Sequence, residues 1–276
     1  MAGDFLHARA AANTLPLTIA ETLGTSGVTA YGGDSPLLGW WRPERAAVAG
    51  VFVHTPPYPA VVTRLPGPAV PSLAEHLAAL GRPLSGVNGD REVAEAFAAE
   101  WVRRTGGAVH LHQQHRLYRL ADLTPPRPAP PGHARIAGTA DLDLVLAWWE
   151  EFVVEVGDTP SDRTNVVADR IGHGGVLLWE VNGAPVAMAG VTRPVAGMVR
   201  VGPVYTPPRL RGRGYAGAVT AAVSRAARTG GAAEVLLFAD LANPTSNGLY
   251  QRLGYRPVGD HVILSFVGGS AVLGGA

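Results

Sequence analysis

The first 123 residues alternate short apolar runs with longer amphipathic segments, a pattern typical of a domain built from strands and helices. Apolar runs bounded by Gly- and Pro-containing turns predict strands at 37–41, 46–54, 60–64, 84–88 and 109–120. Apolar residues at helical spacing predict helices at 5–23, divided or kinked at Pro16, at 71–80, and after Asp90, whose side chain is expected to cap the helix. The first half is therefore expected to be an α/β domain.

The second half repeats this alternation. Two helices, beginning near Thr139 and Ser161, precede predicted strands at 175–181, 185–192 and 198–206, and the Asn-Gly pair at 182–183 predicts a hairpin between the first two. A helix at 215–229 and a strand at 234–240 follow; if that helix is a right-handed crossover, the strands on either side of it are parallel. A short helix from Pro244 to a C-cap at Gly254 and strands starting at Tyr255 and at 261 complete the pattern.

Between the halves, residues 124–132 read T-P-P-R-P-A-P-P-G. So many prolines favour an extended segment without hydrogen-bonded structure, because proline lacks the N–H donor. We therefore expect two domains, 1–123 and 133–276, joined by a linker at 124–132.

Composition narrows the class of protein without naming an activity. The chain has 276 residues, of which 47% are hydrophobic and 16% charged, as in folded soluble proteins. A formal net charge of +1 gives no global field for nucleic acid or membrane binding. The first 20 residues do not resemble a signal peptide, and no apolar run approaches the roughly 20 residues that span a bilayer, so a cytoplasmic protein is expected.

Metal and thiol chemistry are not expected. The chain contains no Cys, which excludes disulfides, thiolate metal sites and a Cys nucleophile. In the predicted strand at 109–120, His110 and His112 share one face and His115 lies on the other, so one face does not supply the three ligands that a site needs. We predict no metal site.

The stretch after residue 206 has the features of an anion site. Pro207 and Pro208 end the strand, Gly212 and Gly214 allow a tight turn with exposed N–H groups, and a helix begins near Tyr215. The unpaired N–H groups and positive dipole end of that helix favour a phosphate or diphosphate. The pattern Arg-x-x-Gly-x-(Gly or Ala) alone is weak, because a chain so rich in Arg, Gly and Ala contains it about once by chance.

A second motif strengthens this interpretation. R-G-R-G-Y-A follows one predicted strand, and N-P-T-S-N-G-L-Y-Q-R-L-G-Y follows the next. Together they resemble the GCN5-related N-acetyltransferase (GNAT) family over about residues 135–267. The resemblance implies a mixed, mostly antiparallel sheet flanked by helices, and it fits the diphosphate motif best as Arg211, Gly214 and Ala216.

The resemblance also implies site residues. Backbone groups of Val204, Tyr205 and Thr206 would hold the pantetheine arm of acetyl-CoA, and Asn243 would bind that arm, with Ser246 or Asn247 nearby. Tyr250 would protonate the leaving CoA thiolate. The diphosphate would be wrapped by the loop residues Arg211, Gly212, Arg213, Gly214, Tyr215 and Ala216.

A general base is harder to assign. Family members often place a Glu on the strand before the diphosphate loop, but residues 198–206 contain no acid. We choose Glu180 first, because strand ends reach a cleft more often than exposed helix faces do. The alternatives are Glu150, Glu151, Asp158 and Asp240.

The resemblance implies transfer of an acetyl group from acetyl-CoA to a primary amine of a small molecule or peptide, by direct attack in a ternary complex. Two alternatives stay open: a non-catalytic acyl-CoA-binding regulatory module, and a transferase that uses another acyl or aminoacyl donor. The first half is expected to be a degenerate GNAT-like copy that binds no CoA, or else an unrelated α+β domain. No nucleic acid or membrane partner is expected, and both a monomer and a homodimer fit the sequence.

Overall fold

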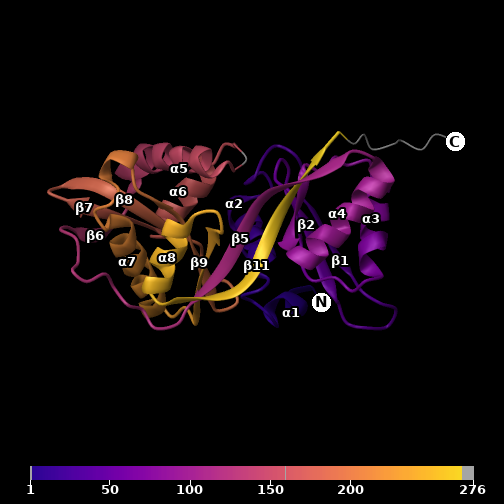
Figure 1. Ribbon diagram of the computed structural model, residues 1–276, viewed down its shortest axis with the longest axis horizontal. Coiled ribbons are helices and arrows are strands. Elements are labelled where there is room, and N and C mark those ends of the chain that lie inside the picture. The colour runs from indigo at the N-terminus through magenta and orange to yellow at the C-terminus, as the bar shows by residue number, and fades with distance from the viewer. Residues whose placement is uncertain (1, 159, 269–276) are drawn as a thin grey trace. The chain divides into compact units, whose positions relative to one another are not determined.

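The computed structural model describes residues 2–158 and 160–268, and they form two compact units (Figure 1). The first unit contains the chain up to Leu17, then Tyr31–Arg116, and then the chain from Gly259 onward. The second contains Thr18–Ala30 and Leu117–Val258. Strands β5 (Ala108–Leu120) and β11 (Tyr255–Val267) contribute residues to both units.

The first unit is a mixed sheet with helices. Its strands lie in the order β1-β2-β3-β4, followed by β11 and β5; β3 is parallel to β4, and β11 is antiparallel to β4. Its core joins β2, β3 and β4 to α3, α4 and residues Val262 and Leu264 of β11. The bounds are α1 (Ala2–His7), β1 (Leu37–Trp41), β2 (Gly50–His54), β3 (Ala60–Val62), α3 (Ala69–Ala79), β4 (Gly86–Asp90) and α4 (Arg91–Thr105).

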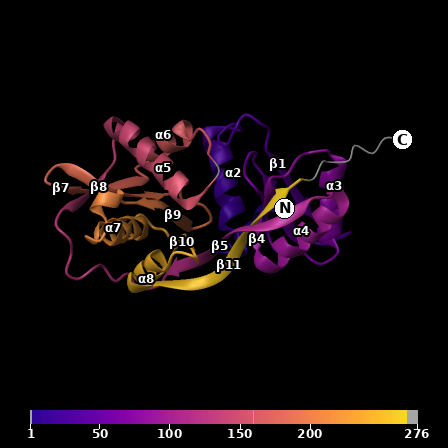
Figure 2. The same cartoon turned by 45° about the horizontal axis from the view of Figure 1, so that its top comes forward.

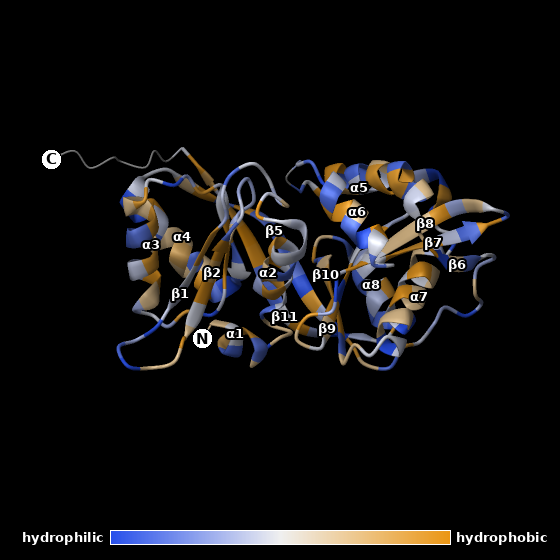
Figure 3. Cartoon of the chain, turned by 180° about the vertical axis from the view of Figure 1, so that it is seen from behind, coloured by the Kyte–Doolittle hydropathy of each residue, from blue (hydrophilic) through white to orange (hydrophobic). Residues whose placement is uncertain are grey.

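The second unit has the strand order β6-β7-β8-β9-β10-β5. Helices α5 and α6 cover one face of this sheet, and α7 and α8 cover the other (Figure 2). The bounds are α2 (Thr14–Ser26), β6 (His133–Ile136), α5 (Leu142–Val156), α6 (Thr164–Gly172), β7 (Val176–Val181), β8 (Ala184–Val191), β9 (Met198–Tyr205), α7 (Tyr215–Thr229), β10 (Glu234–Asp240) and α8 (Pro244–Arg252). In Figure 3 the strands are largely hydrophobic and the helices carry both hydrophobic and hydrophilic residues, as expected where one helix face packs on a sheet.

The predicted fold class is confirmed, and the differences concern local boundaries. The helix predicted at 5–23 is two helices, but the break lies between His7 and Thr14; Pro16 stands in the first turn of α2, where its missing N–H costs little. The strand predicted at 46–54 begins only at Gly50. Asp90 precedes α4 as predicted, yet its side chain makes no capping hydrogen bond and lies 3.8 Å from Arg64 instead.

Residues 124–132 form neither helix nor strand, as predicted, but they do not separate the two units. They lie within the second unit and pack on its surface: Pro126 and Pro130 contact the start of α7, and Trp179 Nε1 donates to the Pro131 carbonyl at 2.9 Å. The division runs through β5 and β11 instead, because β11 residues from Gly259 onward pair with β4, far earlier in the chain. The predicted boundary and the observed division therefore differ.

We predict that Leu264→Ala destabilises the protein by about 2–5 kcal/mol, because Leu264 is 5% exposed and completes the core of the first unit from the last strand. Val267→Ala in the same strand is the control: that side chain is 55% exposed, and its loss is expected to cost less than about 0.5 kcal/mol. The free energy of unfolding in urea measures both. Equal effects would contradict the assignment of β11 to this core.

Candidate functional site

Strands β9 and β10 separate before they end. They pair in parallel only where Met198–Val201 faces Glu234–Leu237, although β9 continues to Tyr205 and β10 to Asp240. On its other side β9 stays paired with β8 as far as Tyr205. The β9 backbone beyond Val201 therefore faces an opening, and backbone groups there can bind an extended amide-containing ligand as an added strand would. The predicted residues Val204, Tyr205 and Thr206 lie at this opening.

A β-bulge decides which way the end of β9 faces. Val204 of β9 pairs with Ala189 of β8, and Val201 of β9 pairs with Val191 of β8. Three residue steps along β9 therefore lie opposite two along β8, which is the bulge. Val201 belongs to the core on the α7 and α8 face, whereas Tyr205 belongs to the core on the α5 and α6 face. Without the extra residue these two side chains, four positions apart, would share a face.

The loop after β9 has the backbone of an anion site. Gly212 and Gly214 have φ values of 75° and 82°, which favour glycine, and α7 begins directly afterwards at Tyr215. Residues 211–214 are exposed, and the first N–H groups of α7 have no carbonyl of the preceding turn to bind. The side-chain hydroxyl of Thr206 is buried without a hydrogen-bond partner among the described residues. These features suit a bound phosphate group.

Arg211 is held by protein groups in this structure. Its Nε donates to the Thr206 carbonyl at 2.9 Å, and one of its terminal nitrogens donates to Glu155 at 2.5 Å. Its guanidinium carbon lies 5.8 Å from the centre of the Tyr205 ring. Arg211 thus ties the loop to β9 and α5, so its predicted contact with a diphosphate would compete with Glu155.

The start of α8 orders the predicted arm-binding residues. Asn243 accepts a hydrogen bond from the Ser246 N–H at 3.0 Å, and Ser246 Oγ donates to the Asn243 carbonyl at 3.1 Å. Asn247, the alternative to Ser246, connects three segments: it donates to the Asp240 and Asn243 carbonyls and accepts from the Tyr118 hydroxyl at 2.8 Å. Asn243 therefore caps its helix, and this role leaves the amide N–H₂ to bind a ligand.

Tyr250 is 8% exposed and packs in the core of the α7 and α8 face. Its ring meets Tyr255 edge-on with ring centres 6.1 Å apart. Burial raises the pKa of Tyr250 to about 12. The phenol therefore stays protonated near neutral pH and can donate a proton, as predicted for it.

Glu180, our first choice for the base, is engaged elsewhere. It lies near the end of β7 and forms an ion pair with Arg135 of β6, which also binds Asp141. Strand β8 separates β7 from β9. A carboxylate that is already paired and lies two strands from the opening is poorly placed to take a proton there.

Among the alternatives, Glu151 is hydrogen-bonded to a side chain of β9 itself. Asp158 pairs with Arg163 at 3.1 Å, and Asp240 accepts from the Ala242 N–H at 2.9 Å. Glu151 accepts a hydrogen bond at 2.5 Å from the hydroxyl of Tyr205, the last residue of β9. Sequence periodicity concealed this contact, because the bulge turns Tyr205 toward α5.

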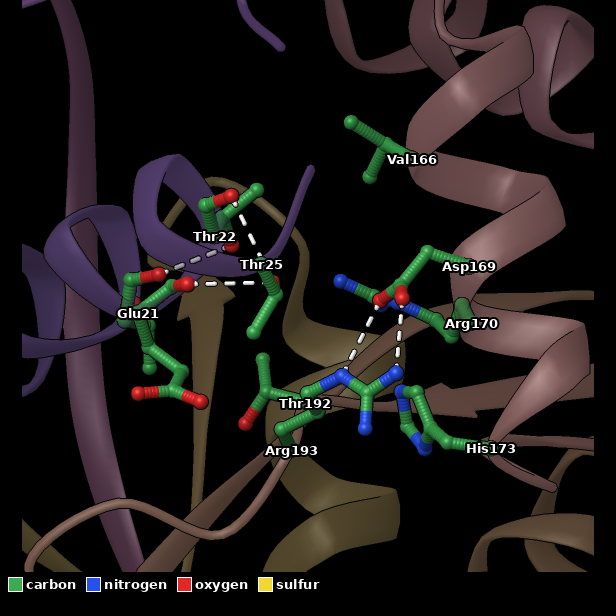
Figure 4. Close-up of a pocket in the computed structure, with 10 residues that line it drawn as sticks. Glu21, Thr22, Thr25, Val166, Asp169, Arg170, His173, Thr192 and Arg193 are labelled. Carbon is green, nitrogen blue, oxygen red and sulfur yellow. Dashed lines mark hydrogen bonds and ion pairs between the residues drawn. The ribbon is translucent and has the colours of Figure 1, made fainter. Parts of the chain in front are cut away.

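A small polar pocket lies in the second unit, between α2, α6 and the end of β8 (Figure 4). Its cavity of about 20 Å³ holds one water-sized group. In Figure 4, Glu21 lies on one side and Arg193, held by Asp169 at 2.7 Å, on the other. The Glu21 carboxylate makes no hydrogen bond with another described residue. Thr22 and Thr25 donate their hydroxyl protons to backbone carbonyls, so for any further hydrogen bond their oxygens can act only as acceptors.

His173, a further residue lining this pocket, is expected to be neutral, because burial and then Arg193 lower its pKa. Arg170, beside it, donates to the Gly202 carbonyl at the β9 bulge. The pocket wall thus reaches the opening through Arg170.

Within 2–158 and 160–268, no group of three or more His, Asp or Glu side chains is arranged to hold a metal ion. In the same ranges, every helix is too short or too polar to cross a membrane.

Comparisons with known proteins agree with this geometry. The Acetyltransferase (GNAT) family model matches residues 142–255. The chain is similar in structure to a GCN5-related N-acetyltransferase from Kribbella flavida, at 22% identity over 95% of this chain and 96% of that chain, with a TM-score of 0.63. It is also similar to a GNAT-family acetyltransferase from Colwellia psychrerythraea, at 13% identity over 83% and 84% of the two chains, with a TM-score of 0.56.

A GCN5-related N-acetyltransferase from Sphaerobacter thermophilus gives 20% identity over 78% and 79% of the chains and a TM-score of 0.55. No curated protein sequence matches the chain. At such identities the structural likeness shows the fold, while the family model covers the segment that contains β9, the anion loop, α7, β10 and α8. Residues 142–255 therefore match the Acetyltransferase (GNAT) family.

Proposed function

We propose that the second unit transfers an acetyl group from acetyl-CoA to a primary amine of a small molecule or peptide. One observation carries the proposal: the opening beside β9 leads directly into a positive-φ glycine loop and a helix N-terminus. A ligand with an extended amide arm and a diphosphate matches this succession of binding groups, and CoA has both. Val204 to Thr206 would bind the arm, and the N–H groups of Gly212 to Ala216 the diphosphate.

The chemistry proposed is direct attack in a ternary complex. The neutral amine attacks the thioester carbonyl, strand N–H groups stabilise the developing oxyanion, and Tyr250 protonates the departing thiolate. The pKa of about 12 that burial gives Tyr250 keeps the phenol protonated near neutral pH, so that its proton is present when the thiolate departs.

The pocket beside β8 supports an amine as the acceptor. The carboxylate of Glu21 and the hydroxyl oxygens of Thr22 and Thr25 accept hydrogen bonds, and an ammonium group has donors only and is about as large as water. We propose that a cationic part of the acceptor binds there.

A second candidate is a non-catalytic acyl-CoA-binding module, which the absence of an acid on β9 and the ion pairing of Glu180 favour. A third candidate is a transferase that uses a longer acyl donor or an aminoacyl donor in place of acetyl-CoA.

Thiol release measured with several acyl-CoA donors against a panel of amines distinguishes the three candidates. Acetyl transfer predicts release with acetyl-CoA, another donor predicts release with that donor instead, and a non-catalytic module predicts CoA binding without release.

We predict that Gly214→Asp weakens CoA binding. A Cβ there would lie at an ordinary 3.7 Å from Pro130, and the strain of a positive φ, which Asp and Asn adopt more readily than other side chains do, is common to the Asp variant and its Asn control. The carboxylate would repel a diphosphate, so the dissociation constant for CoA should rise about tenfold or more at low salt.

Gly214→Asn is the matched control, since it has the same shape without the charge and should change the dissociation constant less than about threefold. Calorimetric titration with CoA measures binding, and thermal unfolding measures stability. Equal losses of binding in both variants would show that the charge is not near a phosphate and would contradict the assigned site.

We predict that Tyr250→Phe lowers kcat about 100-fold with little change in KM, because the substitution removes the proton donor and keeps the buried ring. Tyr255→Phe is the control: its hydroxyl bonds Ser224 at 2.7 Å inside the core, so the variant should lose stability and keep its turnover. The assay is thiol release with the best amine of the panel. Unchanged kcat in Tyr250→Phe would remove this residue from the mechanism, and absence of CoA binding by the unmodified protein would refute the proposed function.

A further inference from the structure

We propose that Glu151, acting through the hydroxyl of Tyr205, accepts the proton that the attacking amine loses. This inference rests on the proposed acetyl transfer and supplies the base that β9 lacks. It assigns a catalytic task to α5, which carries no residue of the two sequence motifs.

The contact itself is short and well supported. The Tyr205 hydroxyl donates to Glu151 at 2.5 Å, joining the last residue of β9 to α5. Tyr205 is 4% exposed, and its ring packs against Trp148 with ring centres 6.3 Å apart. Glu151 is exposed. The pair therefore extends from the buried end of the cofactor strand to solvent, where a proton can be released.

The charges around the pair leave Glu151 available. The charged groups that face Tyr205 are Glu151 and Glu155 of α5 and Arg211 of the loop. Arg211 is bound by Glu155, one turn from Glu151. From α6, which also packs on α5, Arg170 lies over the ring of Trp149. Glu151 is thus held by a neutral phenol rather than by an arginine, in contrast to Glu180.

The Tyr205 phenol is suited to relay a proton, because it is neutral before and after the transfer. Burial and the hydrogen bond to Glu151 raise the pKa of Tyr205 to about 12. A phenolate is therefore unstable there at neutral pH, and a proton passed to the oxygen displaces the phenol's own proton toward the carboxylate.

The proton acceptor and the proton donor lie on opposite faces of the sheet. Tyr205 belongs to the core of the α5 and α6 face, and Tyr250 to the core of the α7 and α8 face. Such an arrangement suits attack on a thioester, because the amine can then lose its proton on one side while the thiolate gains one on the other.

The step balances as follows. The bound ammonium group gives a proton to the Tyr205 oxygen while the Tyr205 hydroxyl proton moves to Glu151. The lone pair freed on the amine forms the C–N bond to the thioester carbon, and the C–S bond breaks with its electron pair on sulfur. Tyr250 gives its proton to the thiolate, the second surplus N–H proton passes to solvent, and solvent later restores Tyr250 and deprotonates Glu151.

The test compares Glu151→Gln, Tyr205→Phe and the control Glu150→Gln in the full chain, with acetyl-CoA and the best amine. Without the base, the reaction must use amine that has already lost its proton to water. At pH 7 we expect kcat/KM of Glu151→Gln to fall at least 100-fold, and the deficit to shrink about tenfold for each unit of higher pH below the pKa of the amine. Glu150→Gln, one residue away and exposed, should follow the unmodified protein.

Tyr205→Phe keeps the ring and should show the same pH dependence, and the double variant should be no slower than Glu151→Gln, because the two groups act in one relay. A merely structural role of these residues would instead give a deficit in kcat/KM that does not depend on pH. Thermal unfolding and CoA titration of each variant show whether stability or cofactor binding has changed. A pH-independent loss, or unchanged kcat/KM in Glu151→Gln, would overturn the inference. If the unmodified protein acetylates no amine, the proposed function itself fails.

Discussion

The parallel pairing of β9 with β10 stops at Val201, and the organisation of the site depends on this limit. If the ladder continued to Tyr205, the backbone N–H and C=O groups of β9 would be hydrogen-bonded to β10, and no extended ligand could bind them. The β-bulge against β8 adds the second consequence, since it turns Tyr205 toward α5 while Val201 stays toward α7. The end of the β9–β10 ladder therefore creates the binding edge, and the bulge gives β9 access to residues of two helical layers.

The sequence predicted those parts of the site that local backbone chemistry determines. Gly212 and Gly214 need positive φ, and α7 must begin where the loop ends, so spacing alone located the anion loop. Tyr250 was placed by a motif within one short helix. Glu151 could not be singled out, because its contact with Tyr205 spans 54 positions and requires the bulge. The choice of Glu180 met the same difficulty: Arg135, its partner, is 45 positions away.

The same distinction explains the boundaries. Most strands and helices appeared within a few residues of the predicted ranges, because hydrophobic periodicity reflects the face that each element buries. The division at 124–132 rested on proline content, which reports backbone extension but says nothing about what the segment packs against. In the structure its prolines contact the glycine-rich start of α7. Likewise, no local pattern indicates that residues after Gly259 pair with β4.

The loop between β3 and α3 of the first unit can be compared with the anion loop between β9 and α7 of the second. Like the second, it has a three-stranded antiparallel or near-antiparallel run, then a helix, then a strand parallel to the last, here β3, α3 and β4. Between β3 and α3, however, Pro66 and Pro68 offer no N–H groups and Gly67 has no positive φ, and Pro71 removes a further N–H group from the first turn of α3. An equivalent strand order therefore does not create a phosphate site, because binding needs donors that converge. That the first unit descends from the same fold stays a prediction, and its loop chemistry favours the second unit as the place where we propose that CoA binds.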